Sequence, residues 1–277
     1  MKILNSITFV LLLIFIGCNN ESQNKTDSES LKATEIRVAA YNVEVSRNAT
    51  AKEIGEALKE YNLDIIAFSE APGGSWTNEI ADILGMHHVI VGQYSTAGHD
   101  DKYKSIASKT PFFETDEILM TDTLHTVTKA KTVADGIELA VYSVHFPFGW
   151  RDQAHIDETT AKISSFVDYL KERQNDEISI VLGDFNFIPT NDLMKSIYHE
   201  MFKEAGLDFT WNALGIDATK VNTHNAFKPE DEGNGNVIDH IMYNPSKAVA
   251  IDGSIIEIQP PLSDHKPVWA LIQLKSD

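Results

Sequence analysis

The chain has almost no cysteine and no long hydrophobic run, and each shortage excludes a class of protein. Its 277 residues include one cysteine, Cys18, so no intrachain disulfide can form. A single thiol also cannot build the thiolate clusters of structural zinc sites. The apolar stretch 7–16 is shorter than the roughly 20 residues that a helix needs to span a bilayer. The fold must therefore be held together by a hydrophobic core.

Basic residues are also scarce. The chain has 23 Lys and Arg against 41 Asp and Glu, which gives a formal net charge of −18. Such a surface repels polyanions at long range, so nucleic acid is not the default partner. The sequence also lacks the clusters of Lys and Arg interleaved with aromatic residues that track a nucleic-acid backbone. Hydrophobic residues make up 43% of the chain, which is ordinary for a globular protein.

The first residues resemble a bacterial lipoprotein signal. Lys2 supplies a positive charge, residues 7–16 supply the apolar segment, and Gly17 and Cys18 follow at once. Cleavage before Cys18 would turn this cysteine into a lipidated N-terminus. We therefore expect a protein of the bacterial cell envelope that is anchored to the membrane by lipid, either in the periplasm or exposed at the surface. The alternative is a plain secretory signal, or a short anchor, with an incidental cysteine.

The rest of the chain divides into a tether and one domain. Residues 1–17 would form the signal peptide, and residues 18–34 are polar, as is typical of a flexible tether. Residues 35–277 contain no second linker and no internal repeat, so they are expected to form a single catalytic domain. Nothing in the sequence points to an oligomer, and a monomer is expected.

Apolar runs and amphipathic segments alternate through this domain. The expected strands cover residues 36–43, 63–68, 88–91, 105–108, 118–120, 127–133, 137–144, 178–182, 237–243, 255–258 and 268–274. The expected helices cover residues 48–61, 77–84, 152–173 and 192–205, and a long polar loop covers 212–236. Asn48 is the expected N-cap of the first helix, and Asp135 with Gly136 supplies a hairpin turn. The pattern favours one α/β domain with mixed sheets and outer helices.

Polar residues follow several of these apolar strands, most clearly in the segment ISIVLGDFNFIP (178–189). Gly183 ends the regular strand, and Asp184 and Asn186 lie two positions apart, so their side chains project to the same side. Phe185 between them must point into the core. A carboxylate and an amide side by side at a strand end can orient a water molecule beside a metal ion. Similar junctions elsewhere in the chain place polar groups at Asn42, Glu70, His145, Asp239, Asp264 and His265.

Polar groups at the ends of buried strands are costly unless they are paired or bound to a metal. Carboxylate and amide oxygens suit hard cations, so this set favours Mg²⁺ or Mn²⁺. The other histidines show no spacing typical of metal ligands and receive no predicted role. They are His87, His88, His99, His125, His155, His199 and His224.

In order along the chain, these junctions resemble the motifs of the endonuclease/exonuclease/phosphatase superfamily, which includes DNase I. The matching segments are YN (41–42), Glu70, SVH (143–145), GDFN (183–186), IDHI (238–241) and SDHKPV (263–268). The resemblance covers roughly residues 35–274. It implies a four-layer α/β/β/α sandwich of two packed mixed β-sheets with an active site at one edge. It also implies a phosphoester hydrolase that depends on Mg²⁺ or Mn²⁺.

The resemblance further implies roles for individual residues. Glu70 would be the main metal ligand, with Asn42 beside it and Asp264 as a further metal contact. Asp184 would orient and deprotonate the attacking water. Asn186 would hold either that water or a non-bridging oxygen of the phosphate.

The same resemblance gives roles to the histidines. His145 and His265 would donate to phosphate oxygens as charge builds in the transition state. Asp239 would lie beside His265, fix its tautomer and favour its charged form. His240 should face away from the site as a structural residue. Arg151 would bind a second phosphate or a carboxylate of the substrate, or else pair with a nearby acid.

The function expected first is a lipid-anchored, extracytoplasmic phosphodiesterase or phosphatase acting on small or exposed phosphoesters. A DNase I-like secreted nuclease is the enzymatic alternative. A catalytically inactive surface binding lipoprotein is the alternative from a different class, and it is disfavoured because none of the central residues is missing. The motifs do not separate phosphomonoesters, phosphodiesters, lipid headgroups and nucleic acids as substrates.

Overall fold

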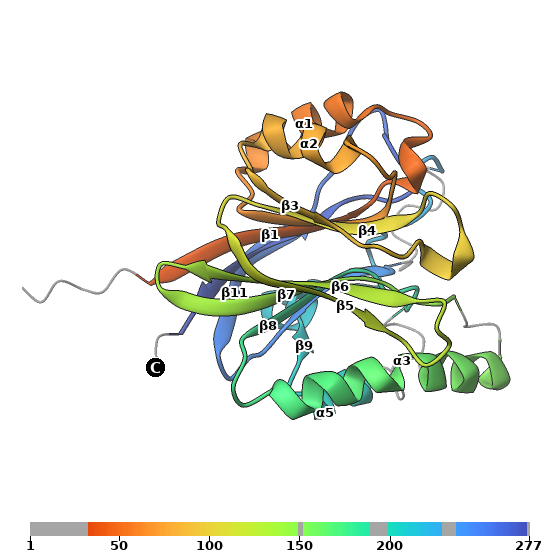
Figure 1. The fold of residues 1–277 in the computed structure, drawn as a ribbon, viewed down its shortest axis with the longest axis vertical. Helices are drawn as coiled ribbons and strands as arrows, with labels where there is room; N and C mark the ends of the chain where they lie inside the picture. Colours follow the sequence, from red (N-terminus) through yellow and green to blue (C-terminus); the bar gives the residue numbers. More distant parts are fainter. Residues whose placement is uncertain (1–32, 149–151, 189–198, 229–236, 276–277) are drawn as a thin grey trace, which may run out of the picture. The chain divides into compact units, whose positions relative to one another are not determined.

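The computed structural model describes residues 33–148, 152–188, 199–228 and 237–275. The described residues form two six-stranded β-sheets that pack face to face, with helices on the outer face of each sheet (Figure 1). This arrangement confirms the predicted four-layer α/β/β/α sandwich. The predicted signal peptide and nearly all of the predicted tether lie outside the described residues.

Both sheets are mixed. In spatial order, the first sheet consists of β11 (Ala248–Ile255), β12 (Val268–Leu274), β1 (Thr34–Asn42), β2 (Ile65–Ala71), β4 (Tyr103–Ser108) and β3 (His88–Val91). The second consists of β5 (Phe112–Leu119), β6 (Thr126–Ala134), β7 (Ile137–His145), β8 (Ser179–Asp184), β10 (Asp239–Tyr243) and β9 (Asp208–Phe209). Strand β1 runs parallel to β2, and β7 runs parallel to β8. The other pairings between these strands are antiparallel.

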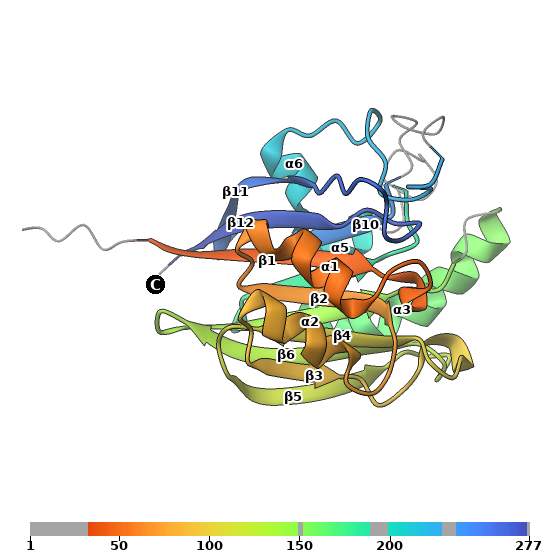
Figure 2. The same cartoon turned by 90° about the horizontal axis from the view of Figure 1, so that it is seen from above.

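Helices form the two outer layers. The first sheet is covered by α1 (Ala51–Leu58) and α2 (Trp76–Leu84), as Figures 1 and 2 show. The second sheet is covered by α3 (Gln153–Arg173) and α5 (Glu200–Glu204). Short helical segments also occur at η1 (Glu44–Ser46), η2 (Lys59–Tyr61), η3 (Thr96–Gly98) and α6 (Thr210–Leu214). Within the described part of the chain, every helix is too short or too polar to cross a membrane.

The two cores explain why the central strands read as continuous apolar runs. Along β1, Val38 and Ala40 belong to the core between the two sheets. Their neighbours Ala39 and Tyr41 belong to a second core that lies under α1 and α2. Both faces of this strand are therefore buried, and the alternation of polar and apolar residues disappears.

The first helix begins later than predicted. Its N-cap is Thr50 and not Asn48, because the Thr50 hydroxyl accepts the backbone N–H of Glu53 while the Glu53 carboxylate accepts that of Thr50. This reciprocal capping box satisfies two backbone donors that a helix start otherwise leaves open. The pair of residues three apart was visible in the sequence and is the better signal.

One predicted strand is wrong. Residues 256–258 are not extended into a strand, and the strand of this region is β11, which ends at Ile255. A register shift between Ala250 and Asp252 interrupts its pairing with β12. The irregularity breaks the two-residue period, and the exposed face of the strand carries Val249 and Ile251. Both effects hid the strand from a pattern search.

Other boundaries were predicted more closely. Strands β3 and β12 have the expected bounds, and β6 and β7 form the expected hairpin. Its turn residues Asp135 and Gly136 have φ angles of 46° and 87°, as a two-residue hairpin turn requires. Strand β5 is longer than predicted because it is an edge strand whose exposed charges mask its pattern. Of the predicted helix 192–205, residues 192–198 lie outside the described residues.

Candidate active site at the ends of two parallel strand pairs

Four predicted site residues lie at the carboxyl ends of the two parallel strand pairs. Asn42 and Glu70 lie at the ends of β1 and β2, in the first sheet. His145 and Asp184 are the last residues of β7 and β8, in the second sheet. The carboxyl ends of parallel strands meet at one edge of a sheet, so each pair brings its two polar groups together.

Two serine hydroxyls join the two sheets directly below this edge. The Ser69 hydroxyl in the first sheet donates to the carbonyl of Val144 in the second, at 2.9 Å. In return, the Ser143 hydroxyl donates to the carbonyl of Phe68, at 3.3 Å. These bonds hold the two strand pairs in close contact, which places the polar groups of both sheets in one site.

Within the second sheet, the close pairing of β7 with β8 requires glycine at position 183. Gly183 has a φ of 143°, and a Cβ atom there would lie 2.1 Å from the carbonyl oxygen of Val144 on the paired strand. No side chain fits without moving β8 away from β7. The glycine in the GDFN segment is therefore needed to bring Asp184 next to His145.

We predict that Gly183→Ala destabilises the protein by more than about 2 kcal/mol, because it adds a backbone clash to the strain of an unusual φ. Chemical denaturation of both proteins measures this difference. Gly85→Ala is the matched control, since Gly85 has a φ of 69° but open space where its Cβ would be. Equal losses in the two variants would contradict the clash argument.

Two site residues adopt strained backbone conformations. Glu70 and Asn186 have φ angles of 52° and 49°, which non-glycine residues adopt rarely. Glu70 lies where the pairing of β2 with β4 shifts register, between Phe68 and Ala71. Such bulges redirect a side chain, and strained residues of this kind cluster at functional sites. Here the bulge turns the Glu70 carboxylate to within 3.9 Å of the His145 ring.

Asp184 is buried at the centre of the site. Its Oδ2 accepts the side-chain amide N–H of Asn42 at 2.9 Å, and its Oδ1 accepts the backbone N–H of Asn186 at 2.8 Å. The ring nitrogens Nε2 of His145 and His265 lie 3.5 and 3.8 Å from the same Oδ2. Burial raises the pKa of Asp184 above its usual range, while the two histidines act in the opposite direction. A carboxylate with a raised pKa is a better proton acceptor near neutral pH.

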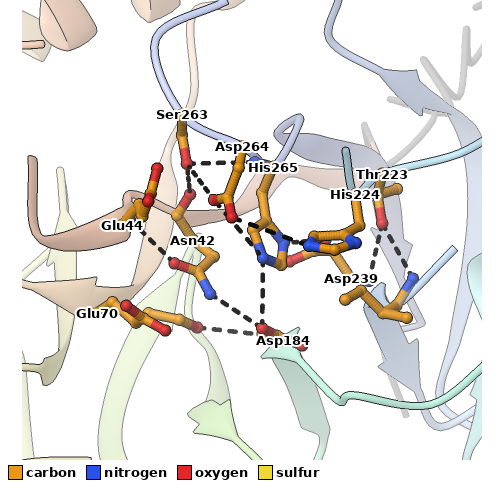
Figure 3. A network of polar contacts seen from close by, with 12 residues as sticks. Asn42, Glu44, Glu70, Asp184, Thr223, His224, Asp239, Ser263, Asp264 and His265 are labelled. Atoms are coloured by element: carbon orange, nitrogen blue, oxygen red, sulfur yellow. Dashed lines mark hydrogen bonds and ion pairs between the residues drawn. The ribbon is translucent and has the colours of Figure 1, made fainter. Parts of the chain in front are cut away.

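His265 and Asp239 form a buried pair beside Asp184 (Figure 3). The Nδ1–H of His265 donates to Oδ2 of Asp239 at 2.8 Å. Burial alone would lower the pKa of His265, but the carboxylates of Asp239, Asp184 and Asp264 raise it to about 10. His265 is therefore charged at neutral pH, and its Nε2–H points toward Asp184.

This raised pKa predicts a pH dependence of stability. Folding shifts the pKa of His265 from an ordinary value near 6.5 to about 10, so its contribution is fully present below 6.5. The contribution is lost as pH rises through 10. In metal-free buffer, the stability advantage of the native protein over His265→Gln should shrink between pH 7 and pH 10, as measured by urea denaturation. A constant difference across this range would contradict the assigned charge.

His145 has the opposite charge state. Burial lowers its pKa to about 4, so the ring is neutral at physiological pH. Its Nε2 faces Asp184 and Glu70, whereas its buried Nδ1 has no hydrogen-bond partner among the residues that the structure describes. The proton therefore belongs on Nε2, where the ring can donate one neutral hydrogen bond into the site.

The neighbouring residues Asp264 and His265 both reach the site because the backbone there is irregular. Asp264 follows Ser263, whose hydroxyl donates to the carbonyl of Asn42 at 2.8 Å and ties this loop to β1. The Oδ1 of Asp264 lies 4.0 Å from Nε2 of His265. Asp264 is about one third exposed, so it lies at the solvent side of the site.

No role was predicted for His224, yet the structure places it at the site. It pairs with His265 in an isolated antiparallel bridge, which puts both side chains on the same side, with ring centroids 4.9 Å apart. Its Nε2 lies 3.8 Å from Asp264 (Figure 3). No spacing in the sequence could have revealed this, because the bridge joins segments about 40 positions apart.

Three further residues named from the sequence are Asn186, His240 and Arg151. Asn186 borders the site, but its amide nitrogen is tied to the carbonyl of Phe146 at 2.9 Å. His240 is buried on the other side of β10, where its ring contacts Trp211 and the carbonyl of Phe187. Arg151, the predicted substrate contact, lies outside the described residues.

The donor atoms of the site suit a divalent cation. Two groups of side chains each bring three potential ligand atoms within 4.8 Å of one another: Asp184, Asp239 and His265, and His224, Asp264 and His265. Within the described part of the chain, the buried Oδ1 of Asp239 has no hydrogen-bond partner, so it is an unsatisfied acceptor. Because His265 is charged and donates from its ring nitrogens, the carboxylate oxygens of these groups are the donors that suit a hard cation. Of the predicted metal ligands, Glu70 pairs with Lys102, and the side-chain oxygen of Asn42 accepts the backbone N–H of Glu44.

The fold and the site define an α/β sandwich with a buried Asp and His cluster at one edge of its two sheets. The model of the Endonuclease/Exonuclease/phosphatase family matches residues 39–265. The chain belongs to this family, whose superfamily includes metal-dependent phosphoester hydrolases and some inactive members. A comparison with curated proteins finds no matching sequence.

Solved structures share the fold at low sequence identity. An endonuclease/exonuclease/phosphatase from Beutenbergia cavernae DSM 12333 aligns with a TM-score of 0.72 at 18% identity, over 88% of this chain and 72% of that one. TDP2 from D. rerio, complexed with single strand DNA product, aligns with a TM-score of 0.68 at 16% identity, over 86% and 99%. A family protein from Leptotrichia buccalis C-1013-b aligns with a TM-score of 0.66 at 15% identity, over 86% and 100%.

Proposed function

We propose that this protein is a lipid-anchored, extracytoplasmic phosphoester hydrolase that uses Mg²⁺ or Mn²⁺. The observation that carries the proposal is the placement of buried Asp184 between a neutral His145 and a charged His265, in a chain of this family. Hydrolysis of a phosphoester needs a base for the water and hydrogen-bond donors for the phosphate oxygens. The lipoprotein-like segment that ends at Cys18 supports the proposed location.

Asp184 accepts the proton of the attacking water in this proposal. Burial raises its pKa, which makes it a stronger base than an exposed aspartate. Asn42 and the backbone N–H of Asn186 each occupy one of its oxygens and fix the plane of the carboxylate. This fixed orientation lets the carboxylate act on one water at one position.

The two histidines bind the phosphate in different charge states. His265 presents a charged Nε2–H, which stabilises a non-bridging oxygen as negative charge develops there. His145 presents a neutral Nε2–H to a second oxygen. Asp239 holds the His265 ring in its orientation through the Nδ1–H bond of 2.8 Å. Asp239 is a positioning residue that does not need to touch the substrate.

A divalent metal would be held by Glu70 and Asp264, with Asn42 close by. When bound, it would neutralise charge on the phosphate and on the leaving oxygen. Two carboxylates are sufficient for Mg²⁺, which usually keeps several of its waters. The amide oxygen of Asn42 accepts the N–H of Glu44 with one lone pair, which leaves its second lone pair for a metal.

A nuclease is the second candidate. The similarity in fold to TDP2, which was solved with a single strand DNA product, favours it. The net charge of −18 opposes it, because counterion release from a polyanion needs basic side chains. Arg151 remains a proposed contact for a second phosphate or for a carboxylate of the substrate.

A metal-dependent activity panel tests the proposed function. The full-length protein is assayed with a phosphomonoester, an activated phosphodiester, plasmid DNA, RNA and sphingomyelin, with Mg²⁺ or Mn²⁺ and with EDTA. We expect EDTA to reduce hydrolysis of a small phosphoester by more than about 100-fold, because the metal offsets charge in the transition state. Faster cleavage of plasmid DNA would favour the nuclease. No EDTA-sensitive hydrolysis of any compound would refute the proposal.

A further inference from the structure

Lys102 forms an ion pair with a carboxylate of the site. Its Nζ lies 2.6 Å from Oε2 of Glu70. The pair follows from the strand register, because Ala71 at the end of β2 pairs with Tyr103 at the start of β4. The other carboxylate oxygen, Oε1, lies 3.9 Å from Nε2 of His145. Glu70 therefore joins Lys102 to the group of residues that we assign to the phosphate.

The backbone of Lys102 is anchored by hydrogen bonds, so its side chain starts from a fixed position. Its N–H donates to the hydroxyl of Ser95 at 3.1 Å, and its carbonyl accepts the N–H of Thr96 at 2.7 Å. The side chains of Lys102 and Glu70 are only 24% and 13% exposed. The contact therefore differs from the mobile, fully solvated ion pairs of a protein surface.

The same two strands carry a second ion pair at their opposite end. Lys109 follows β4 and lies 3.1 Å from Asp64, which precedes β2. That pair only links two strand ends, and its side chains are about one third exposed. Glu70 differs from Asp64 because its left-handed backbone and the bulge turn it toward His145. A role in the site is therefore expected of Lys102 and not of Lys109.

We propose that Lys102 is a resident cation of the active site. Its ammonium group competes with the divalent metal for Glu70, and it contacts the substrate phosphate once the metal holds that carboxylate. The inference rests on the proposed function. A lysine suits both positions, because its charge is compact and its four-carbon stem lets it move between two nearby anions. In the metal-free protein, Lys102 also limits the charge repulsion between Glu70 and the other carboxylates.

The first test measures metal binding without turnover. The full-length protein and its variants are titrated with Mn²⁺ alone by calorimetry. Lys102→Gln should bind Mn²⁺ at least about fivefold more tightly than the native protein, because a competing charge is removed. Lys102→Arg keeps the charge and Lys109→Gln lies at the far end of the strands, so both should bind as the native protein does. Tighter binding cannot result from a loss of structure.

The second test measures phosphate binding. With saturating Mn²⁺, Lys102→Gln should bind inorganic phosphate at least about fivefold more weakly, whereas Lys109→Gln should not change. An unchanged Mn²⁺ affinity in Lys102→Gln would overturn the competition, and an unchanged phosphate affinity would overturn the contact. In either case the native protein would still bind metal and hydrolyse phosphoesters. A native protein that does neither would refute the proposed function as well.

Discussion

Replacing Asp184 by asparagine should lower kcat by about 10²- to 10⁴-fold, which is the usual contribution of a general base. Asparagine has nearly the same shape but cannot accept the proton of water. Its single carbonyl oxygen can accept from Asn42 or from the backbone of Asn186, but not from both as the carboxylate does. KM should change much less than kcat, because the lost interaction belongs to the transition state.

The stability of the variant separates this effect from misfolding. Burial raises the pKa of Asp184, which means that its ionised form is disfavoured in the folded protein. Replacement by a neutral group therefore should not lower the free energy of unfolding by more than about 1 to 3 kcal/mol, the cost of one lost buried hydrogen bond. Steady-state kinetics and urea denaturation measure the two quantities. Turnover within tenfold of the native rate would refute the role of Asp184 as the base.

Much of the fold could be predicted because abrupt ends of apolar runs mark strand ends. Strands β3 and β12 have the predicted bounds for this reason. Periodicity does not mark the places where the backbone departs from a regular strand or helix. The bulge between Ala250 and Asp252 hid β11, and a capping box at Thr50 placed the start of α1 later than Asn48 suggested. Neither a register shift in a strand nor the exact start of a helix can be read from the spacing of apolar residues along the sequence.

The site was predictable to a different degree. Each polar residue at a strand end could be recognised alone, but periodicity does not say which strands become neighbours. The parallel pairs β1 with β2 and β7 with β8 supply that information, and the Ser69 and Ser143 hydroxyls join them. From the sequence alone, only the resemblance to a known family grouped these residues into one site.

Two charged or polar residues near the site were missed entirely. Lys102 and His224 lie in polar segments with no period of their own. Lys102 meets Glu70 through the register of β2 with β4, and His224 meets Asp264 through a single bridge to His265. Such contacts depend on tertiary pairing, which no local pattern in one sequence records.

Removing the His265 ring should have the second large effect on catalysis. His265→Ala should reduce kcat by about 10²- to 10³-fold, since it deletes a charged donor aimed at the developing negative charge. Steady-state kinetics with a small phosphoester measures this loss. Asp239→Asn tests the cause of the charge, because it keeps the ring but removes the carboxylate that raises its pKa most. Its pKa should then fall from about 10 toward the ordinary value near 6.5.

Asp239→Asn should therefore differ from the native protein in the pH dependence of its activity. His265 must be protonated to act, so Asp239→Asn should lose activity as pH rises through the lowered pKa of His265. The native protein should keep activity to about pH 10. Asp122→Asn is the matched control, because Asp122 accepts from Nδ1 of His125 at 2.7 Å in a second Asp and His pair. A basic limb that stays at the native position in Asp239→Asn would show that Asp239 does not set the charge of His265.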